Sequence, residues 1–132
     1  MKAVKIFQTL MISIFVVTFF TGCGESYDKN VMTVRNGVVY AYTEVPIGKA
    51  FDYFFSDGKW KSFKTDDKET VVEFNGDCTW YNSPAKIKIQ FILDGEEFQV
   101  NYVGINGVDI DTIEINGIME KILSEYKTRG KK

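Results

Sequence analysis

The chain has 132 residues, of which 16 are basic, 18 are acidic and none is histidine, so its formal net charge is −2. A net negative charge argues against a nucleic-acid partner, because nucleic acids are bound by basic surfaces. The absence of histidine excludes Ser-His and Cys-His nucleophiles, histidine-ligated zinc and the commonest general base. Binding modules, structural proteins and enzymes that work through carboxylates remain.

The N-terminal stretch has the features of an export signal. Lys2 and Lys5 precede an apolar run over residues 6–20, which is short for a membrane-spanning helix and is followed by small residues. This order of basic, apolar and small residues is typical of a cleaved secretory peptide.

A cysteine follows this signal directly. The sequence Phe20-Thr21-Gly22-Cys23 resembles the bacterial lipobox, although Phe20 stands where Leu, Val or Ile is usual. The resemblance implies that residues 1–22 are a lipoprotein signal peptide. It also implies that the thiol of Cys23 receives a diacylglycerol and that Cys23 becomes the new N-terminus. An ordinary secreted protein and an uncleaved anchor are the alternatives.

The rest of the chain has the length of one domain. Removal of residues 1–22 takes away two lysines and no acid, so the remainder has a formal charge of −4. We expect a tether over residues 23–31, a single α+β domain over residues 32–127 and a basic tail over residues 128–132. Once Cys23 is acylated, Cys78 is the only other cysteine, so no disulfide can form within one chain.

The start of this domain has the pattern of a two-stranded ribbon and then a helix. Residues 32–35 and 38–42 flank Asn36-Gly37, a dipeptide that favours a tight hairpin turn. Pro46 suits the first turn of a helix. The apolar residues after it are spaced as on one helical face: Ile47, Ala50, Phe51 and Phe54. Gly48 in this helix predicts a close approach of its backbone to the sheet.

Alternating polar and apolar residues predict four strands between residues 59 and 105. A four-residue loop at residues 81–84 and a two-residue turn at Asp94-Gly95 connect the last three strands. The pattern indicates an antiparallel meander with one apolar and one polar face.

The predicted connections also set the register of the meander. They place Trp60 and Phe91 opposite Phe74, and Phe98 opposite Phe91. Tyr102 then falls on the same apolar face as these four residues.

A second helix follows the meander. Apolar residues recur every three or four positions from Ile115 to Tyr126, and Asp111 with Glu114 has the form of a capping box. Alternatively, Asn116 could cap a shorter helix that starts at Gly117. Together the elements predict an α+β fold, namely a four-stranded antiparallel β-meander with two helices packed on one face, preceded by a short β-ribbon.

Few residues have the arrangement of a catalytic or metal site. Cys78 lies on the apolar face of a central strand, which indicates an inert packed thiol, with an intermolecular disulfide as the alternative. Three acidic pairs could in principle serve acid–base chemistry or a hard cation: Asp66-Asp67, Glu96-Glu97 and Asp109 with Asp111. Each pair lies at a predicted turn or helix start, so we interpret them as solvated acids and predict no cofactor and no metal.

Six aromatic residues fall outside the predicted apolar face: Tyr40, Tyr42, Tyr53, Phe55, Phe63 and Tyr81. Exposed aromatic side chains are enriched where proteins bind partners. We predict that four of them form a binding surface on the ribbon and first helix: Tyr40, Tyr42, Tyr53 and Phe55. In the alternative interpretation these four residues pack beneath the ribbon or cover a sheet edge.

Five short packing and turn motifs lie between Val38 and Leu123. They are Val45–Phe51, Gly58–Lys61, Val72–Gly76, Ile89–Phe91 and Ile105–Gly107. Together they are similar to small bacterial lipoproteins and extracytoplasmic modules of unknown function, some of which are joined to a membrane-anchored zinc ribbon. The resemblance implies a shared fold and compartment and no catalytic residues. Zinc-ribbon cysteines are absent from this sequence.

These features predict a lipoprotein of the bacterial cell envelope that is tethered to the membrane by its N-terminal lipid and faces outside the cytoplasm. We expect a non-enzymatic binding module, such as an inhibitor, an exclusion factor or an assembly accessory, with an envelope protein as its partner. The alternatives are a cell-wall glycan hydrolase that uses paired carboxylates and a purely structural lipoprotein.

Overall fold

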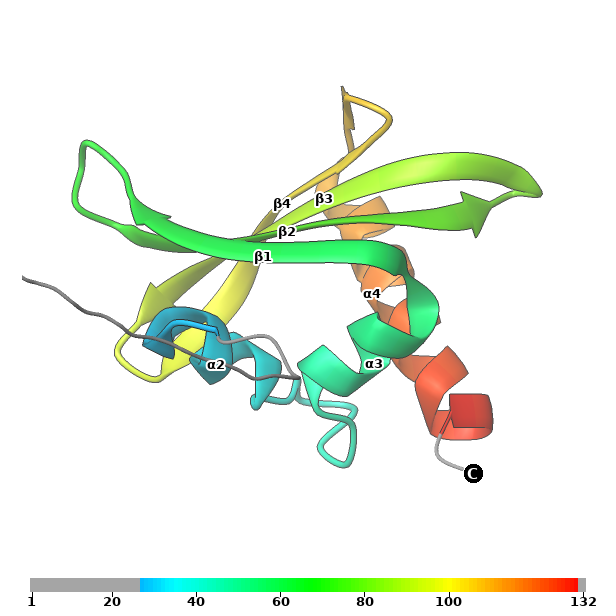
Figure 1. Cartoon of the computed structure of the whole chain (residues 1–132), viewed down its shortest axis with the longest axis horizontal. Helices are drawn as coiled ribbons and strands as arrows, with labels where there is room; N and C mark the ends of the chain where they lie inside the picture. Colours follow the sequence, from blue (N-terminus) through cyan, green and yellow to red (C-terminus); the bar gives the residue numbers. More distant parts are fainter. Residues whose placement is uncertain (1–26, 131–132) are drawn as a thin grey trace, which may run out of the picture.

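An antiparallel β-sheet with helices along one face forms the fold (Figure 1). The computed structural model describes residues 27–130. The elements in chain order are α2 (Lys29–Arg35), α3 (Ile47–Phe54), β1 (Ser56–Lys64), β2 (Thr70–Trp80), β3 (Ser83–Asp94), β4 (Glu97–Ile105), β5 (Val108–Asp109), α4 (Thr112–Glu125) and the π-helical turn η2 (Tyr126–Gly130). The strands pair with their sequence neighbours from β1 to β5. The predicted α+β class and antiparallel sheet are confirmed, and this part of the chain adds a short fifth strand and a third α-helix.

The predicted β-ribbon is wrong, because its first strand belongs to the helix α2. The carboxylate of Asp28 caps this helix: one oxygen accepts a hydrogen bond from the backbone N–H of Val31, and the other accepts one from the Ser62 hydroxyl, both at 2.8 Å. Val31 and Val34 are buried, so their spacing of three is helical. Asn36 follows the helix at a φ of −85°, not the positive φ that the expected hairpin turn needs.

Two predicted boundaries also differ from the elements that form. Residues 29–31, at the end of the predicted tether, lie in α2, and residues 128–130 of the predicted tail lie in η2. The second strand of the predicted ribbon is a loop in which Val39 and Tyr42 form an isolated bridge. The folded domain therefore reaches further toward both termini than hydrophobic patterning indicates.

Phe51 of α3 lies at the centre of the hydrophobic core and is fully buried. Its ring centroid is 4.8 Å from that of Phe74, 5.4 Å from that of Trp60 and 5.5 Å from that of Phe55. Burial of one such side chain contributes about 1.5–3 kcal/mol, so this cluster fixes α3 against the sheet. The helix α4 adds four buried residues to the core: Ile118, Met119, Ile122 and Leu123.

The faces of β2 and β3 are as predicted, but their register is displaced by two residues. Their turn consists of two residues, Tyr81 and Asn82, instead of four, so Phe74 pairs with Ile89 and not with Phe91. Because side chains alternate with a period of two, a displacement of two leaves each side chain on its predicted face.

The register of β3 and β4 is also displaced by two residues from the prediction, and a β-bulge follows further along the pair. Its turn is Gly95-Glu96, so Phe98 pairs with Leu93. A β-bulge then adds one residue to β4, which inverts the alternation. Val103 is therefore buried, and the prediction that Tyr102 lies on the apolar face is wrong.

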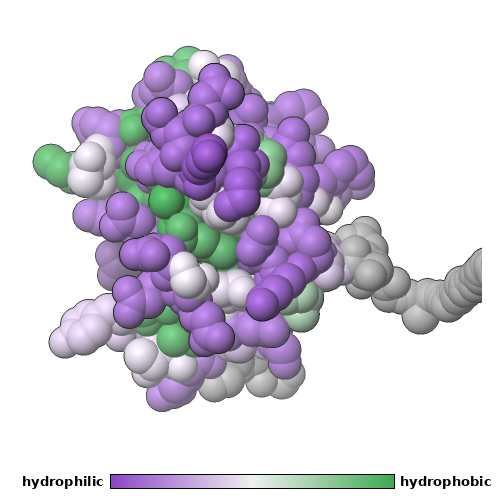
Figure 2. Space-filling view, turned by 90° about the vertical axis from the view of Figure 1, so that its left-hand side faces the viewer, coloured by the Kyte–Doolittle hydropathy of each residue, from purple (hydrophilic) through white to green (hydrophobic). Residues whose placement is uncertain are grey.

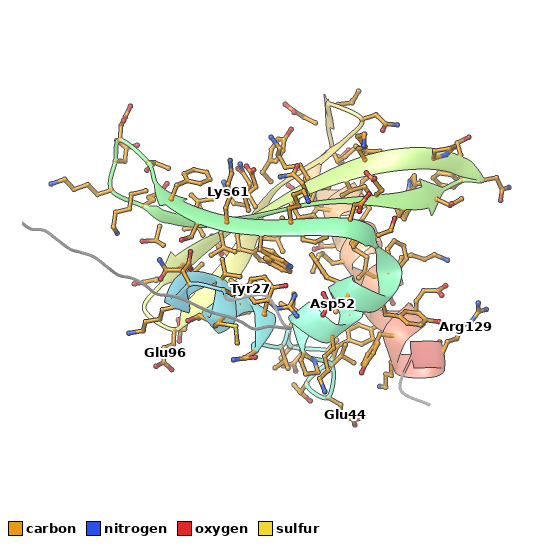
Figure 3. The ribbon with its side chains drawn as sticks, viewed as in Figure 1. Tyr27, Glu44, Asp52, Lys61, Glu96 and Arg129 are labelled. Atoms are coloured by element: carbon orange, nitrogen blue, oxygen red, sulfur yellow. The ribbon has the colours of Figure 1, made fainter. Side chains whose placement is uncertain are left out.

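Glu73 is a buried carboxylate that pairs across the strands with Lys61, whose side chain lies on the sheet face away from the helices (Figure 3). It accepts hydrogen bonds from the amides of Gln90 at 2.8 Å and Asn75 at 3.0 Å. The ammonium groups of Lys61 and Lys88 lie 3.5 Å and 3.9 Å from its oxygens. Burial alone raises the pKa of Glu73, but the hydrogen bonds and the lysine charges outweigh burial, so this pKa lies below its usual value.

We expect Glu73→Gln to lower the free energy of unfolding by about 1–3 kcal/mol at pH 7, because it removes charge-assisted hydrogen bonds. The pKa of Glu73 is lower in the folded than in the unfolded chain, so its contribution is present above about pH 4.5. That contribution is lost as the pH falls through the lower folded pKa. Denaturant titrations of both proteins should therefore show a difference that is largest near pH 7 and shrinks below about pH 4.

Glu96→Gln, in the exposed β3–β4 turn, is the matched control and should change the free energy of unfolding by less than about 0.5 kcal/mol. An equal loss for Glu73→Gln at pH 7 and at pH 3 would contradict the electrostatic explanation.

Candidate functional site

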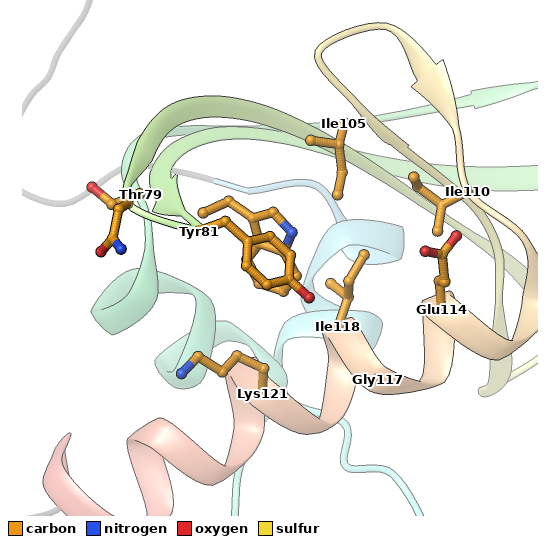
Figure 4. A pocket seen from close by; sticks show the side chains of 10 residues that line it. Thr79, Tyr81, Ile105, Ile110, Glu114, Gly117, Ile118 and Lys121 are labelled. Carbon is orange, nitrogen blue, oxygen red and sulfur yellow. The ribbon is translucent and has the colours of Figure 1, made fainter.

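A surface pocket of about 660 Å³ lies between the β2–β3 turn, the end of β4 and the helix α4 (Figure 4). We call it the hairpin–helix pocket. Binding pockets of proteins have volumes of roughly 300–1,000 Å³, so its size suits a ligand or an inserted side chain.

Apolar side chains form the inner wall of the hairpin–helix pocket. Ile118 of α4 is buried, and Ile105 and Ile110 are half-buried beside it. The half-buried ring of Trp80 meets the ring of Tyr81 edge-on, with centroids 5.5 Å apart. Figure 4 shows Tyr81 and Ile118 directed toward one another from the hairpin and the helix. An apolar group that enters this space would leave water for an apolar surface, which is favourable.

Tyr81 is held at the rim of the pocket in a strained backbone conformation. Its φ is 50°, and that of Asn82 is 64°. This left-handed region suits glycine and asparagine but costs a bulky residue roughly 1–2 kcal/mol. Tyr81 is 87% exposed, so burial in the fold does not offset the cost, and its edge-on contact with Trp80 offsets only about 0.5–1.5 kcal/mol of it. Backbone strain that packing offsets only in part makes this residue a candidate for a functional role.

Gly117 is a second destabilising residue at the same pocket. It lies in the interior of α4, where glycine costs about 1 kcal/mol relative to alanine. A Cβ atom at this position would meet no atom within 4 Å, so packing does not require glycine. At Gly48, by contrast, a Cβ atom would lie 2.8 Å from the guanidinium carbon of Arg35. The missing side chain of Gly117 leaves the pocket open.

Two charges of opposite sign lie on the α4 side of the pocket. Glu114 and Lys121 are seven residues apart, so they share one helix face with Gly117 between them. The carboxylate of Asp111 accepts a hydrogen bond from the backbone N–H of Glu114 at 2.9 Å, which fixes the turn that carries Glu114. Thr79 adds a polar group from the hairpin side.

The structure separates the four aromatic residues that were predicted to form a binding surface. Phe55 is only 7% exposed and packs in the core with its ring 4.8 Å from that of Phe74, so its predicted exposure is wrong. The chain turns from α3 directly into β1 at this residue, which brings its ring under the sheet. Tyr40, in the loop before α3, is 98% exposed.

Tyr42 and Tyr53 both contact the C-terminal part of the fold, where η2 follows α4. The Tyr42 hydroxyl donates a hydrogen bond to Glu120 at 3.5 Å, and the Lys127 ammonium lies 5.7 Å from its ring centroid. Tyr53 is 48% exposed and meets Tyr126 edge-on at 6.0 Å. These contacts within the fold can explain the positions of both tyrosine rings without a binding partner.

The opposite end of the molecule, where the β1–β2 and β3–β4 turns lie, is mostly hydrophilic with a narrow apolar strip (Figure 2). A hollow of about 390 Å³ is bordered there by Met32, Gly37 and Phe98. A Cβ atom on Gly37 would overlap the ring of Phe98, so packing explains this glycine. None of the described residues around this hollow has a positive φ.

Cys78 and the three acidic pairs predicted from the sequence do not line the hairpin–helix pocket. Cys78 is half-buried against the core, and burial followed by the charge of Asp77 raises the pKa of its thiol, which makes it a weak nucleophile. Within residues 27–130, no group of three or more acidic or cysteine side chains could hold a metal ion. The only acidic residue that lines the hairpin–helix pocket in this part of the chain is Glu114.

The predicted lipidation site lies outside the described residues. Cys23 and the signal peptide over residues 1–22 precede residue 27, so the lipobox assignment stays a prediction. Of the helices within residues 27–130, none has the length and hydropathy needed to cross a membrane.

Sequence reasoning found one residue of the pocket and missed the others. Tyr81 was identified as an exposed aromatic residue, but its turn was predicted to be a longer loop. Gly117 was considered only as the first residue of a possible shorter helix, whereas the structure places it in the interior of α4. A glycine inside a helix is the signal that could have identified it. Trp80 and Gly117 come together only through the docking of α4 on the sheet, which no local pattern predicts.

We expect Gly117→Ala to raise the free energy of unfolding by about 0.5–1 kcal/mol, because alanine favours the helix and meets no obstacle. Tyr81→Asn should leave this free energy unchanged or raise it by up to about 1 kcal/mol, because asparagine tolerates positive φ. Thermal and denaturant unfolding of the purified variants measures both effects. A loss of more than about 1 kcal/mol in either variant would show that the residue is retained for stability.

Comparisons with protein-family models, with curated proteins and with solved structures find no match for this chain. Support for a function therefore comes from the residues of the hairpin–helix pocket and from the N-terminal sequence.

Proposed function

We propose that the chain is a membrane-tethered lipoprotein of the bacterial envelope whose domain is a non-enzymatic binding module. The hairpin–helix pocket is its binding site, and an envelope protein is its partner. An inhibitor, an exclusion factor and an assembly accessory all belong to this class.

One observation carries the proposal: two residues that destabilise the fold border the same pocket. Tyr81 adds backbone strain that its ring contact with Trp80 offsets only in part, and Gly117 adds backbone entropy although no packing contact requires glycine there. Natural proteins tend to keep such residues where binding or catalysis needs them. Here one residue presents an aromatic ring at the rim and the other keeps the inner wall open.

The position of the anchor restricts where the partner can lie. A lipid on Cys23 would precede the start of α2 at Lys29 by six Cα–Cα steps. Six steps span at most about 22 Å, so the domain would stay close to the membrane surface. A partner in the same membrane, or at its surface, fits this geometry.

The pocket gives less support to a glycan hydrolase. Hydrolysis through two carboxylates needs a pair of acids on either side of the bond. Glu114 is the single acid among the described residues of the pocket, and the three acidic pairs predicted from the sequence do not line it. A purely structural lipoprotein would have no reason to keep the two destabilising residues.

The anchor is tested by Cys23→Ser, with Cys78→Ser as the matched control. We expect Cys23→Ser to abolish labelling by radioactive palmitate and to accumulate unprocessed precursor, because only a thiol accepts the diacylglycerol. Cys78→Ser should retain both labelling and mature size on a gel. Unchanged labelling and size in Cys23→Ser would refute the lipoprotein assignment.

The pocket is tested by Gly117→Leu, which fills it with a side chain that α4 accepts well. We expect crosslinked partner recovered from native membranes to fall by tenfold or more, equivalent to about 1.4 kcal/mol. Asn116→Leu puts the same side chain on an exposed position of α4 that does not line the pocket, and should capture partner like the wild type.

Equal capture by Gly117→Leu and the wild type would exclude the pocket as the binding site. A combined Tyr40→Ser and Tyr53→Ser variant completes the experiment. If that variant alone loses capture, the tyrosine surface predicted from the sequence is the binding site instead.

A further inference from the structure

The two charges of the hairpin–helix pocket have a defined separation. Glu114 and Lys121 are seven residues apart in α4, which corresponds to about 10.5 Å along the helix axis. In Figure 4, Ile118 lies between Glu114 and Lys121 and is directed into the pocket. The site is therefore negative at one end, apolar in the middle and positive at the other end.

Neither Glu114 nor Lys121 is held by a strong ion pair within the domain. Within residues 27–130, Glu114 forms no ion pair at 4 Å or less. Lys121 pairs with Glu125 at 3.2 Å, and its side chain is 53% exposed. The Glu125 side chain is 22% exposed and also pairs with Arg129 at 3.9 Å, so Glu125 keeps a cationic partner when Lys121 turns to a ligand. Pairs with i,i+4 spacing on a helix contribute about 0.3–0.5 kcal/mol, so the cost of this turn is low.

The apolar middle of the site favours a side chain over a sugar. Three isoleucines and the ring of Trp80 surround the space that Gly117 leaves open. A sugar would place hydroxyl groups against these isoleucines and lose hydrogen bonds to water. A leucine, methionine or phenylalanine side chain would lose only unfavourable contact with water.

From this arrangement we infer that the pocket binds an extended segment of a partner protein, and this inference rests on the proposed function. The segment has one bulky apolar residue between a basic residue, which meets Glu114, and an acidic residue, which meets Lys121. In an extended chain, residues i, i+2 and i+4 point to one side, and the outer two are about 13 Å apart. The long basic and acidic side chains of the segment can make up the difference between about 13 Å and the spacing of about 10.5 Å that separates Glu114 from Lys121 along the helix axis.

The test uses capped synthetic pentapeptides and the detergent-solubilised full chain. The matching peptide is Lys-Ala-Phe-Ala-Glu, and the controls are Lys-Ala-Phe-Ala-Lys, Glu-Ala-Phe-Ala-Glu and Lys-Ala-Ala-Ala-Glu. Binding is followed by the amide chemical shifts of Gly117 and Lys121. Each exposed ion pair changes an affinity by up to about fivefold. We expect the matching peptide to bind at least threefold more tightly than any control.

Charge reversal in the protein should change this preference. Lys121→Glu makes both ends of the site negative, so its best ligand becomes Lys-Ala-Phe-Ala-Lys. Glu114→Lys makes both ends positive, so its best ligand becomes Glu-Ala-Phe-Ala-Glu. Lys121→Glu replaces the pair with Glu125 by a repulsion, and Glu114→Lys puts a cation in the first turn of α4, so each variant should lose about 0.3–1 kcal/mol and unfold a few degrees below the wild type.

Three outcomes would overturn the inference. The first is the same ranking of peptides by all three proteins. The second is binding of the N-acetylglucosamine hexamer without binding of any peptide, which would identify a glycan site. The third is peptide binding that Gly117→Leu does not abolish, which would place the peptide elsewhere. If Gly117→Leu abolishes partner capture while the peptides show no charge preference, the proposed function stands and the inferred partner segment is wrong.

Discussion

The packing of Phe51 against the sheet is the contact on which the other elements depend. Alternating strands give β2 and β3 one apolar face, which must be covered. Phe51 covers its centre, with its ring 4.8 Å from that of Phe74 and 6.2 Å from that of Phe91. The next residue, Asp52, is thereby held at the surface of α3, where it accepts two hydrogen bonds from Arg35 of α2. One buried ring therefore fixes α3 directly and α2 through its neighbour.

The contacts of Arg35 explain why the first part of the domain could not be predicted from local pattern. Its guanidinium carbon lies 4.6 Å from the ring centroid of Tyr27 and 5.5 Å from that of Trp60, and the guanidinium also donates to Asp52. The side chain also covers Gly48, so the close approach predicted for this glycine is to Arg35 and not to the sheet. These contacts join distant segments, and they outweigh the hairpin preference of the Asn-Gly dipeptide that follows α2.

The same distinction between local and distant contacts separates the correct from the incorrect parts of the sheet prediction. Alternation determines which face of the sheet a side chain occupies. Both misplaced turns displaced the predicted register by two residues, so the predicted faces were still correct next to these turns. The bulge in β4 shifts the register by one residue, so the prediction placed Tyr102 on the wrong face of the sheet. Its signal was present in the sequence, because the apolar positions change from Phe98 and Val100 to Val103 and Ile105. The capping of α4 by Asp111 was one of two predicted helix starts, because it depends on neighbours within one turn. The alternative start, capped by Asn116, is wrong because the helix begins at Thr112.

The candidate site depends on local sequence pattern and on contacts between distant segments, and only the part set by local pattern was predicted. Tyr42 and Tyr53 were noticed because they are aromatic, yet Tyr42 contacts Glu120 of α4 and Tyr53 contacts Tyr126 of η2, so packing can explain both. Tyr81 and Gly117 differ because their costs have separate physical origins, one in backbone strain and one in chain entropy. Together they amount to about 2–3 kcal/mol, a large share of the 5–15 kcal/mol that stabilises a typical domain. Packing alone gives no reason for two such costs to meet at one pocket, whereas a binding site that needs an exposed ring and an open wall requires both.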